Sequence, residues 1–149
     1  MIKVATHLYT IVNVIVFMEV KIDTKEKFTV ITPQVPHIYD NMAADLAAVC
    51  LPILENKVKN IILNLQAVSA IDDDSAMDIA KLQHRFYEQH ASFVICEMKE
   101  PVEAVFEKSE LMDVLNYTPT ESEAWDIVQM EEIERELLDS DDVHFDVEE

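Results

Sequence analysis

The 149-residue chain contains no glycine, and this absence excludes a whole class of binding sites. Loops that cradle nucleotide phosphates depend on glycine, because its missing Cβ atom lets the backbone approach the phosphate oxygens closely. The usual nucleotide-binding signatures are therefore excluded.

Basic residues are scarce as well: 11 Lys and Arg stand against 30 Asp and Glu, which gives a formal net charge of −19. Proteins that bind nucleic acid use Lys and Arg to contact phosphates, so this balance argues against DNA or RNA as a partner. The same charge argues against an anionic membrane surface. Half of the residues are hydrophobic, so the chain can bury a core, and its length suits one compact domain with tails.

Cysteine is also sparse, with only Cys50 and Cys96 in the chain. Both lie in apolar segments and they do not form a Cys-x-x-Cys pair, so neither a disulfide framework nor a zinc site is implied. We interpret them as reduced, packed thiols of a cytoplasmic protein.

The N-terminal segment contains an apolar run, Leu8–Met18, preceded by a single lysine. The run is shorter than the ~20 residues of a transmembrane helix, and it lacks the basic start and cleavage site of a secretory signal. We expect no direct insertion into a membrane. Residues 1–17 are either an additional β-strand, since Val and Ile dominate, or a non-domain extension upstream of a true start at Met18. We favour the second interpretation, because the pattern from Glu19 onward is that of a complete domain.

From Glu19 onward, strand and helix patterns alternate along the chain. A β-hairpin is expected first, because 19–23 and 28–32 alternate apolar and polar residues around a polar turn. Later strands are expected at 58–65, 93–96 and 114–116, and helices at 42–55, at 76–90, from Pro101 and from a Thr120–Glu123 capping box. Pro52 should kink or shorten the first helix. The pattern predicts an α/β fold with a single layer of mixed β-sheet, in which a β-hairpin is followed by β–α repeats.

Two short segments carry a resemblance to a known family. The apolar strand Asn60–Leu65 is followed, after a short connection, by Ile71–Ser75 and a helix. This resembles the STAS domain of bacterial anti-sigma factor antagonists, in which an apolar strand ends in Asp-Leu-Ser and is followed by an apolar residue, Asp-Ser-Ser-Gly and a helix. The spacing continues without a gap to Ser92–Ile95, and Leu111–Leu115 resembles the segment before the family's last strand. The resemblance covers residues 19–138, and we expect a STAS-like domain at 18–138.

The resemblance implies a switch, because the second serine of Asp-Ser-Ser-Gly is phosphorylated in the antagonists. The gapless match places Asp74 at that serine, Asp73 at the first serine and Ser75 at the glycine, while Asp72 matches. A match shifted by one residue would place Ser75 at the phosphorylated position and Ala76 at the glycine, but it disrupts the agreement downstream. The phosphorylation switch therefore does not carry over directly.

The charge of a carboxylate at position 74 can be compared with that of a phosphoserine. Phosphoserine carries about −1.5 to −2 charges, so Asp74 would imitate the phosphorylated state weakly and permanently. Each carboxylate near a helix start is stabilised by about 0.3–1 kcal/mol through the helix dipole. Asp73 or Asp74 is also expected to cap the helix, which is compatible with contact to a partner.

The partner-binding region is therefore expected at the start of this helix, and its residues are Asp72, Asp73, Asp74, Ser75, Ala76 and Met77. The partner that the resemblance implies is an anti-sigma factor that is also a serine kinase of the GHKL type, or another protein that binds STAS domains. The alternative is a STAS scaffold that works without phosphorylation, or a STAS subunit of a lipid-transport ATPase complex.

Catalytic and metal-binding sites are not expected. Three adjacent carboxylates in a turn point in different directions and rarely converge on one ion. His84 and His90 are six residues apart, which is not the spacing of a paired-histidine site. We expect no enzymatic activity, no metal and no cofactor. Residues 139–149 are expected to form an acidic, disordered tail.

Overall fold

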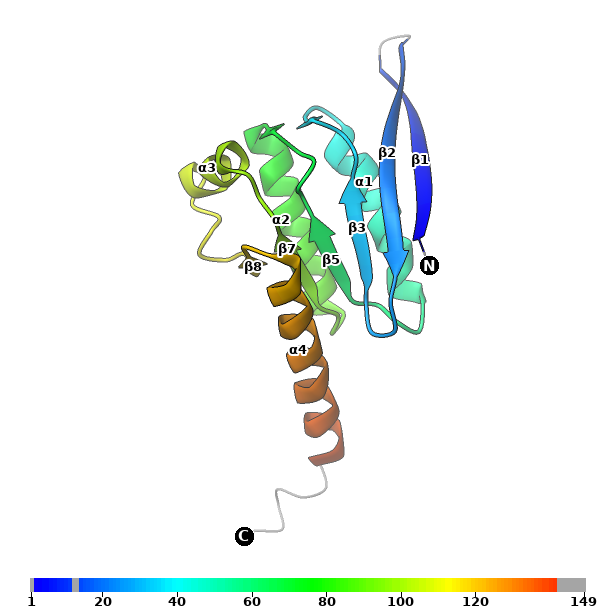
Figure 1. The fold of residues 1–149 in the computed structure, drawn as a ribbon, viewed down its shortest axis with the longest axis vertical. Coiled ribbons are helices and arrows are strands. Elements are labelled where there is room, and N and C mark those ends of the chain that lie inside the picture. The colour runs from blue at the N-terminus through cyan, green and yellow to red at the C-terminus, as the bar shows by residue number, and fades with distance from the viewer. Residues whose placement is uncertain (1, 12–13, 142–149) are drawn as a thin grey trace.

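The computed structural model describes the backbone of residues 2–11 and 14–141 and the side chains of residues 18–139. A six-stranded sheet has its strands in the order β1-β2-β3-β5-β7-β8 (Figure 1). These strands are β1 (Ile2–Ile11), β2 (Val14–Thr24), β3 (Thr29–Pro33), β5 (Ile61–Asn64), β7 (Phe93–Cys96) and β8 (Tyr117–Thr118). Strand β2 is antiparallel to both β1 and β3, and from β3 onward neighbouring strands are parallel.

Helices follow the strands as the pattern predicts. They are α1 (Met42–Cys50), a 3-10 helix (Leu51–Glu55), α2 (Asp73–Glu88), α3 (Glu100–Lys108) and α4 (Glu121–Asp141). The prediction of an α/β fold built on a mixed sheet, with a hairpin before the β–α repeats, is confirmed. The capping box is present too, because the amide of Glu123 donates to Thr120 Oγ1 and the amide of Thr120 donates to Glu123 Oε1, each at 3.2 Å.

The two faces of the sheet are covered by different helices. One face shares a core with α1, α2 and α3, and α4 covers the other face. Figure 1 shows α4 in front of the sheet, with α1 and α2 behind it. Strands β5 and β7 consist almost entirely of apolar residues because both of their faces are buried in this way.

Several elements have bounds that differ from those expected. Helix α2 begins at Asp73 instead of near Ala76, and β8 is formed by Tyr117–Thr118. The prediction of a strand at 114–116 is wrong, because the amide of Val114 donates to the carbonyl of Leu111 in a turn, at 3.0 Å. A small parallel sheet of β4 (His37–Ile38) and β6 (Ala70–Ile71) was not predicted. The effect expected of Pro52 is confirmed, since α1 gives way there to the 3-10 helix.

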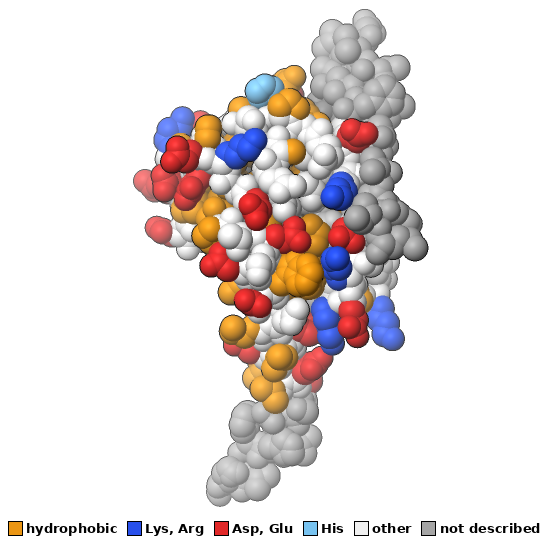
Figure 2. Space-filling view, in the orientation of Figure 1, with side chains coloured by type: hydrophobic (Ala, Val, Ile, Leu, Met, Phe, Trp, Pro, Cys, Tyr) orange, Lys and Arg blue, Asp and Glu red, His pale blue; other side chains and the backbone are white. Residues whose placement is uncertain are grey.

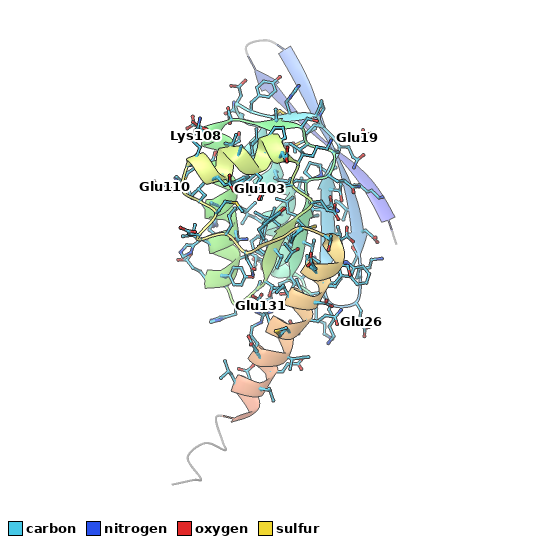
Figure 3. All side chains as sticks on the ribbon, turned by 60° about the vertical axis from the view of Figure 1, so that its left-hand side comes forward. Glu19, Glu26, Glu103, Lys108, Glu110 and Glu131 are labelled. Atoms are coloured by element: carbon cyan, nitrogen blue, oxygen red, sulfur yellow. The ribbon has the colours of Figure 1, made fainter. Side chains whose placement is uncertain are left out.

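Left-handed backbone occurs at residues other than glycine. In the described chain these are Asp40, His90, Glu97 and Glu110, with φ of 55°, 60°, 61° and 62°. His90 ends α2: its amide donates to the carbonyl of Tyr87 at 3.0 Å, and the next amide, that of Ala91, donates to Phe86 at 2.9 Å. Glu110, which Figure 3 labels, ends α3 in the same way. Its amide donates to the carbonyl of Glu107 at 3.0 Å, and the amide of Leu111 donates to that of Phe106 at 2.9 Å. Both helix ends thus use a position that glycine normally occupies.

At the N-terminus, β1 pairs with β2 from Ile2 opposite Asp23 to Ile11 opposite Val14. Residues 2–11 thus form a β-strand, as in the first of the two interpretations of residues 1–17. Whether residues 1–17 are dispensable for folding stays a prediction. At the other end, α4 continues to Asp141. The rest of the predicted acidic tail, residues 142–149, lies outside the described residues.

Candidate functional site

Asp72 lies at the junction of β6 and α2. Its backbone is extended, with φ −91° and ψ 168°, and its Oδ1 atom accepts a hydrogen bond from the amide of Ser75 at 2.9 Å. Its Oδ2 atom accepts a hydrogen bond from the amide of Asp40 at 3.3 Å. Asp72 is therefore the N-cap of α2, and the prediction that Asp73 or Asp74 caps this helix is wrong.

The pKa of the Asp72 carboxyl lies below its ordinary value. Burial is the largest single influence and acts in the opposite direction, but hydrogen bonds from Ser75 and from main-chain amides together outweigh it. The carboxylate is therefore ionised at neutral pH, where its charge stabilises the start of α2 through the helix dipole.

The residues after Asp72 are divided between two sides of the first helical turns. Ser75 and Ala76 are completely buried. Asp73, Asp74 and Met77 are exposed. The structure therefore brings carboxylates and one methionine together on the surface, and it removes the Ser75 hydroxyl from solvent.

The two exposed carboxylates of this turn differ in their surroundings. Asp73 Oδ1 lies 3.6 Å from Nζ of Lys108, the last residue of α3, and both side chains are largely exposed. Figure 3 shows Lys108 at the end of that helix. An exposed ion pair of this kind contributes roughly 0–1 kcal/mol. Asp74 has no cation within 4 Å among the described residues, so its charge is available to a partner.

Two exposed residues beside this surface were missed in the sequence. Asp78 follows Asp74 by one helical turn on α2, a spacing that was visible in the sequence. Tyr39, half exposed, lines a shallow hollow of about 260 Å³ together with Asp72. The sequence holds no signal for Tyr39, because its loop and Asp72 are brought together only by the pairing of β4 with β6.

The chemistry open to this surface is electrostatic selection of a partner: the exposed carboxylates attract basic groups and repel acidic ones. Within residues 2–11 and 14–141, no group of three or more His, Cys, Asp or Glu could hold a metal ion. Burial raises the pKa of the Cys50 thiol to about 12 and also raises the pKa of Cys96. Neither thiol is an activated nucleophile at neutral pH.

Strand β5 ends in Asn64, which stands where the family's Asp-Leu-Ser has its aspartate. The chain therefore has an amide at this position, and the family has a carboxylate. Asn64, at the end of β5, is 3% exposed, and its Nδ2 donates to Glu121 Oε1 at 2.8 Å. Its Oδ1 accepts from the amide of Gln66 at 2.9 Å. A carboxylate at this position would face the carboxylate of Glu121, so the amide suits this neighbour.

Comparisons with known proteins agree with this description. The family model of the STAS domain matches residues 19–124. A putative anti-sigma factor antagonist from Thermotoga maritima has a TM-score of 0.65 at 21% identity, over 72% of this chain and 92% of that one. An anti-sigma factor antagonist from Mycobacterium paratuberculosis has a TM-score of 0.64 at 12% identity, over 85% and 95% of the two chains. The murine anion transporter Slc26a9 has a TM-score of 0.58 at 12% identity, over 86% of this chain and 22% of the transporter.

These structural similarities concern the fold alone. The search of curated proteins gives no match. In the described part of the chain, no helix combines the length and the apolar character needed to cross a bilayer.

Proposed function

Because the chain belongs to the STAS domain family, we propose that it is a non-catalytic bacterial regulator that acts in the cytoplasm by binding another protein. The partner is an anti-sigma factor that is also a serine kinase of the GHKL type. It docks on the exposed side chains at the start of α2, namely Asp72, Asp73, Asp74 and Met77. The observation that carries this proposal is the exposed carboxylate of Asp74, at the position that matches the regulated serine of the antagonists.

The burial of Ser75 supports this assignment. A residue that a kinase modifies must be accessible, whereas the Ser75 side chain has no exposed area. Asp74 is exposed and precedes it in the same helical turn. The regulator therefore presents a fixed negative charge at the docking surface.

A second candidate function follows from the same observation. A surface with a fixed charge suits a STAS scaffold, or a subunit of a lipid-transport ATPase complex, that binds without phosphorylation. The similarity to part of an anion transporter supports this candidate only at the level of the fold.

Affinity purification of the full chain from its own cell, followed by mass spectrometry, distinguishes the two candidates. We expect an ATP-binding kinase of the GHKL type to copurify. A transporter ATPase in its place would support the second candidate and contradict the first.

Substitution of Asp74 tests the docking surface itself. We expect little phosphorylation of the natural chain by its partner kinase with ATP, and we expect Asp74→Ser to create an acceptor. A partner that rejects negative charge should also bind Asp74→Ser more tightly, by about 1–2 kcal/mol if the contact excludes water. Binding is measured by calorimetry, and phosphate is mapped by mass spectrometry.

The matched control is Asp78→Ser, which removes an exposed carboxylate one turn further along α2. This variant should be phosphorylated less than Asp74→Ser, and its affinity for the partner should rise less. Stoichiometric phosphate on Ser75 of the natural chain would overturn the assignment of Asp74. Unchanged affinity in Asp74→Ser would show that Asp74 contributes only to the start of the helix and not to partner binding.

A further inference from the structure

A groove lies between α2 and the segment 111–116 that leads into β8. Its volume is about 670 Å³, which falls within the roughly 300–1,000 Å³ of typical small-molecule sites. Met77, Ala80 and Lys81 of α2 line one wall, and Leu111 and Val114 line the other. The groove extends beyond the docking surface proposed above and shares only Met77 with it.

The two walls are held together by hydrogen bonds, so the groove does not depend on a ligand for its shape. Gln83 of α2 is 4% exposed, and its Oε1 accepts from the amide of Asn116 at 3.0 Å. Its Nε2 donates to the carbonyl of Phe93 at 2.8 Å and to that of Asn116 at 3.2 Å. A site fixed in this way binds with a smaller loss of conformational freedom.

Apolar side chains at the groove are open to water. Val114 is 69% exposed and Met77 is 40% exposed, and they lie on opposite walls. A ligand with an apolar body would cover both, and removing apolar area from water favours binding.

Two free cations stand beside this apolar surface. Lys81 and Arg85 are exposed, line the groove and are one helical turn apart. Across the described residues, neither has a carboxylate within 4 Å, whereas the neighbouring His84 pairs with Glu88 at 3.2 Å. In a chain of net charge −19, such a pair marks a place where an anion is attracted.

A carboxylate in the chain itself determines which end of the groove takes an anion. Glu131 of α4 accepts hydrogen bonds from the Tyr87 hydroxyl at 2.8 Å and from Asn116 Nδ2 at 3.1 Å, and both donors line the groove. Figure 3 shows Glu131 on α4. Its charge repels a second anion from that end, so an anionic group is directed to Lys81 and Arg85.

We propose that this groove binds a monocarboxylate with an apolar body, of the kind of a medium-chain fatty acid. The carboxylate lies between Lys81 and Arg85, and the hydrocarbon chain covers Met77, Leu111 and Val114. The site requires no second protein and holds the carboxylate on a part of α2 outside the docking surface, although its apolar end shares Met77 with that surface.

Calorimetric titration of the full chain with decanoate, below its micellar concentration, tests the proposal. We expect saturable binding of one molecule per chain, with amide chemical-shift changes at Ala80 and Val114 in NMR spectra. Decylamine has the same apolar chain and the opposite charge, and it should bind at least about tenfold more weakly.

Two double variants separate the site from the net charge of the molecule. Lys81→Glu with Arg85→Glu should weaken decanoate binding by about tenfold or more. Lys57→Glu with Lys59→Glu makes the same change in net charge at two exposed lysines outside the groove, and should bind decanoate like the natural chain. Val114→Asp, at an exposed position, should also weaken binding without loss of folding.

Several results would overturn the proposal. They are no binding of decanoate to the natural chain, equal binding of decylamine, or an equal loss of affinity in both double variants. Binding of an acidic amphipathic peptide in the absence of decanoate binding would assign the groove to protein recognition and contradict the ligand class.

Discussion

The carboxylate of Asp72 connects two segments that are far apart in the sequence. One oxygen accepts the Ser75 amide within α2, and the other accepts the Asp40 amide in the loop before α1. A single side chain therefore begins the helix and holds the neighbouring loop beside it.

Replacing this residue tests its contribution to stability. We expect Asp72→Ala to lower the free energy of unfolding by about 0.5–2 kcal/mol, because the helix loses its N-cap. Asp74→Ala, in the same turn but without a capping bond, should cost less, about 0.3–1 kcal/mol from the helix dipole. Urea denaturation at neutral pH measures both values. Equal losses in the two variants would contradict the capping role.

The same variant has a defined pH dependence. The pKa of Asp72 is lower in the folded chain, so its contribution is present above the unfolded pKa of about 4 and is lost as the pH falls through the folded value. The stability difference between the natural chain and Asp72→Ala should therefore shrink in acid. A difference that stays constant down to about pH 2 would contradict an ionised cap.

Asn64 provides a second test at the scale of single residues. We expect Asn64→Asp to destabilise the fold by about 1–3 kcal/mol at neutral pH, because a buried carboxylate would face Glu121. Its folded pKa would be raised, so the loss should be smallest below about pH 4 and grow as the pH rises. The double variant N64D/E121Q should recover much of the stability. No recovery would show that burial, and not the neighbouring charge, causes the loss.

The sequence located the acidic start of α2 but not the residue that caps it. Three adjacent aspartates are equivalent as capping residues when judged by type alone. The choice is made by the pairing of β4 with β6, which brings the amide of Asp72 to the carbonyl of Ile38 at 3.2 Å. Two-residue strands leave no periodic pattern in a sequence, so this sheet could not be predicted. The groove beside α2 could not be predicted either, because its two walls are joined by a hydrogen bond between Gln83 and Asn116, which are 33 residues apart.

At the scale of elements, the ends of α2 and α3 are the unusual feature. Both helices end in a left-handed residue with a side chain, His90 or Glu110. A Cβ atom in this conformation costs about 1–2 kcal/mol, and glycine avoids that cost although it loses more freedom on folding.

We therefore expect His90→Gly and Glu110→Gly each to raise the free energy of unfolding, by about 0.5–1 kcal/mol. Ala104→Gly, at an exposed position within α3, is the control and should lower it by about 1 kcal/mol. Thermal and urea denaturation measure these changes. A loss of stability in both glycine variants at the helix ends would show that the His90 and Glu110 side chains stabilise those ends.

The strands and helices themselves were largely predictable, because apolar runs and helical spacing are local signals. Strand β7 occupies the predicted residues, and the Thr120–Glu123 capping box opens α4. The last strand was placed too early because Val114 is apolar, yet its side chain is exposed in a turn. An apolar side chain does not by itself indicate a buried strand.

At the scale of the whole molecule, the contribution of the N-terminal residues can be measured directly. We expect a chain that begins at Met18 to fold and to melt like the full chain, because the match to the family begins at residue 19 and the buried Met18 is retained. A chain that ends at Asp139 controls for the effect of shortening. Differential scanning calorimetry provides the melting temperatures.

A drop of many degrees in the chain that begins at Met18 would contradict this expectation. It would show that β1 is an integral strand whose burial contributes several kcal/mol, at roughly 25 cal/mol per Å² of apolar area. The pairing of β1 with β2 from Val14 to Asp23 makes this comparison informative in either direction.

The order of the strands in the large sheet is also their order in the chain. During synthesis, each new strand can pair with one that has already left the ribosome, so no strand of this sheet waits for a later one. Helix α4 is made after all the strands of this sheet, and it covers the face that includes Val30 and Ile62. That apolar face therefore stays open to water, and to chaperones, until α4 has left the ribosome.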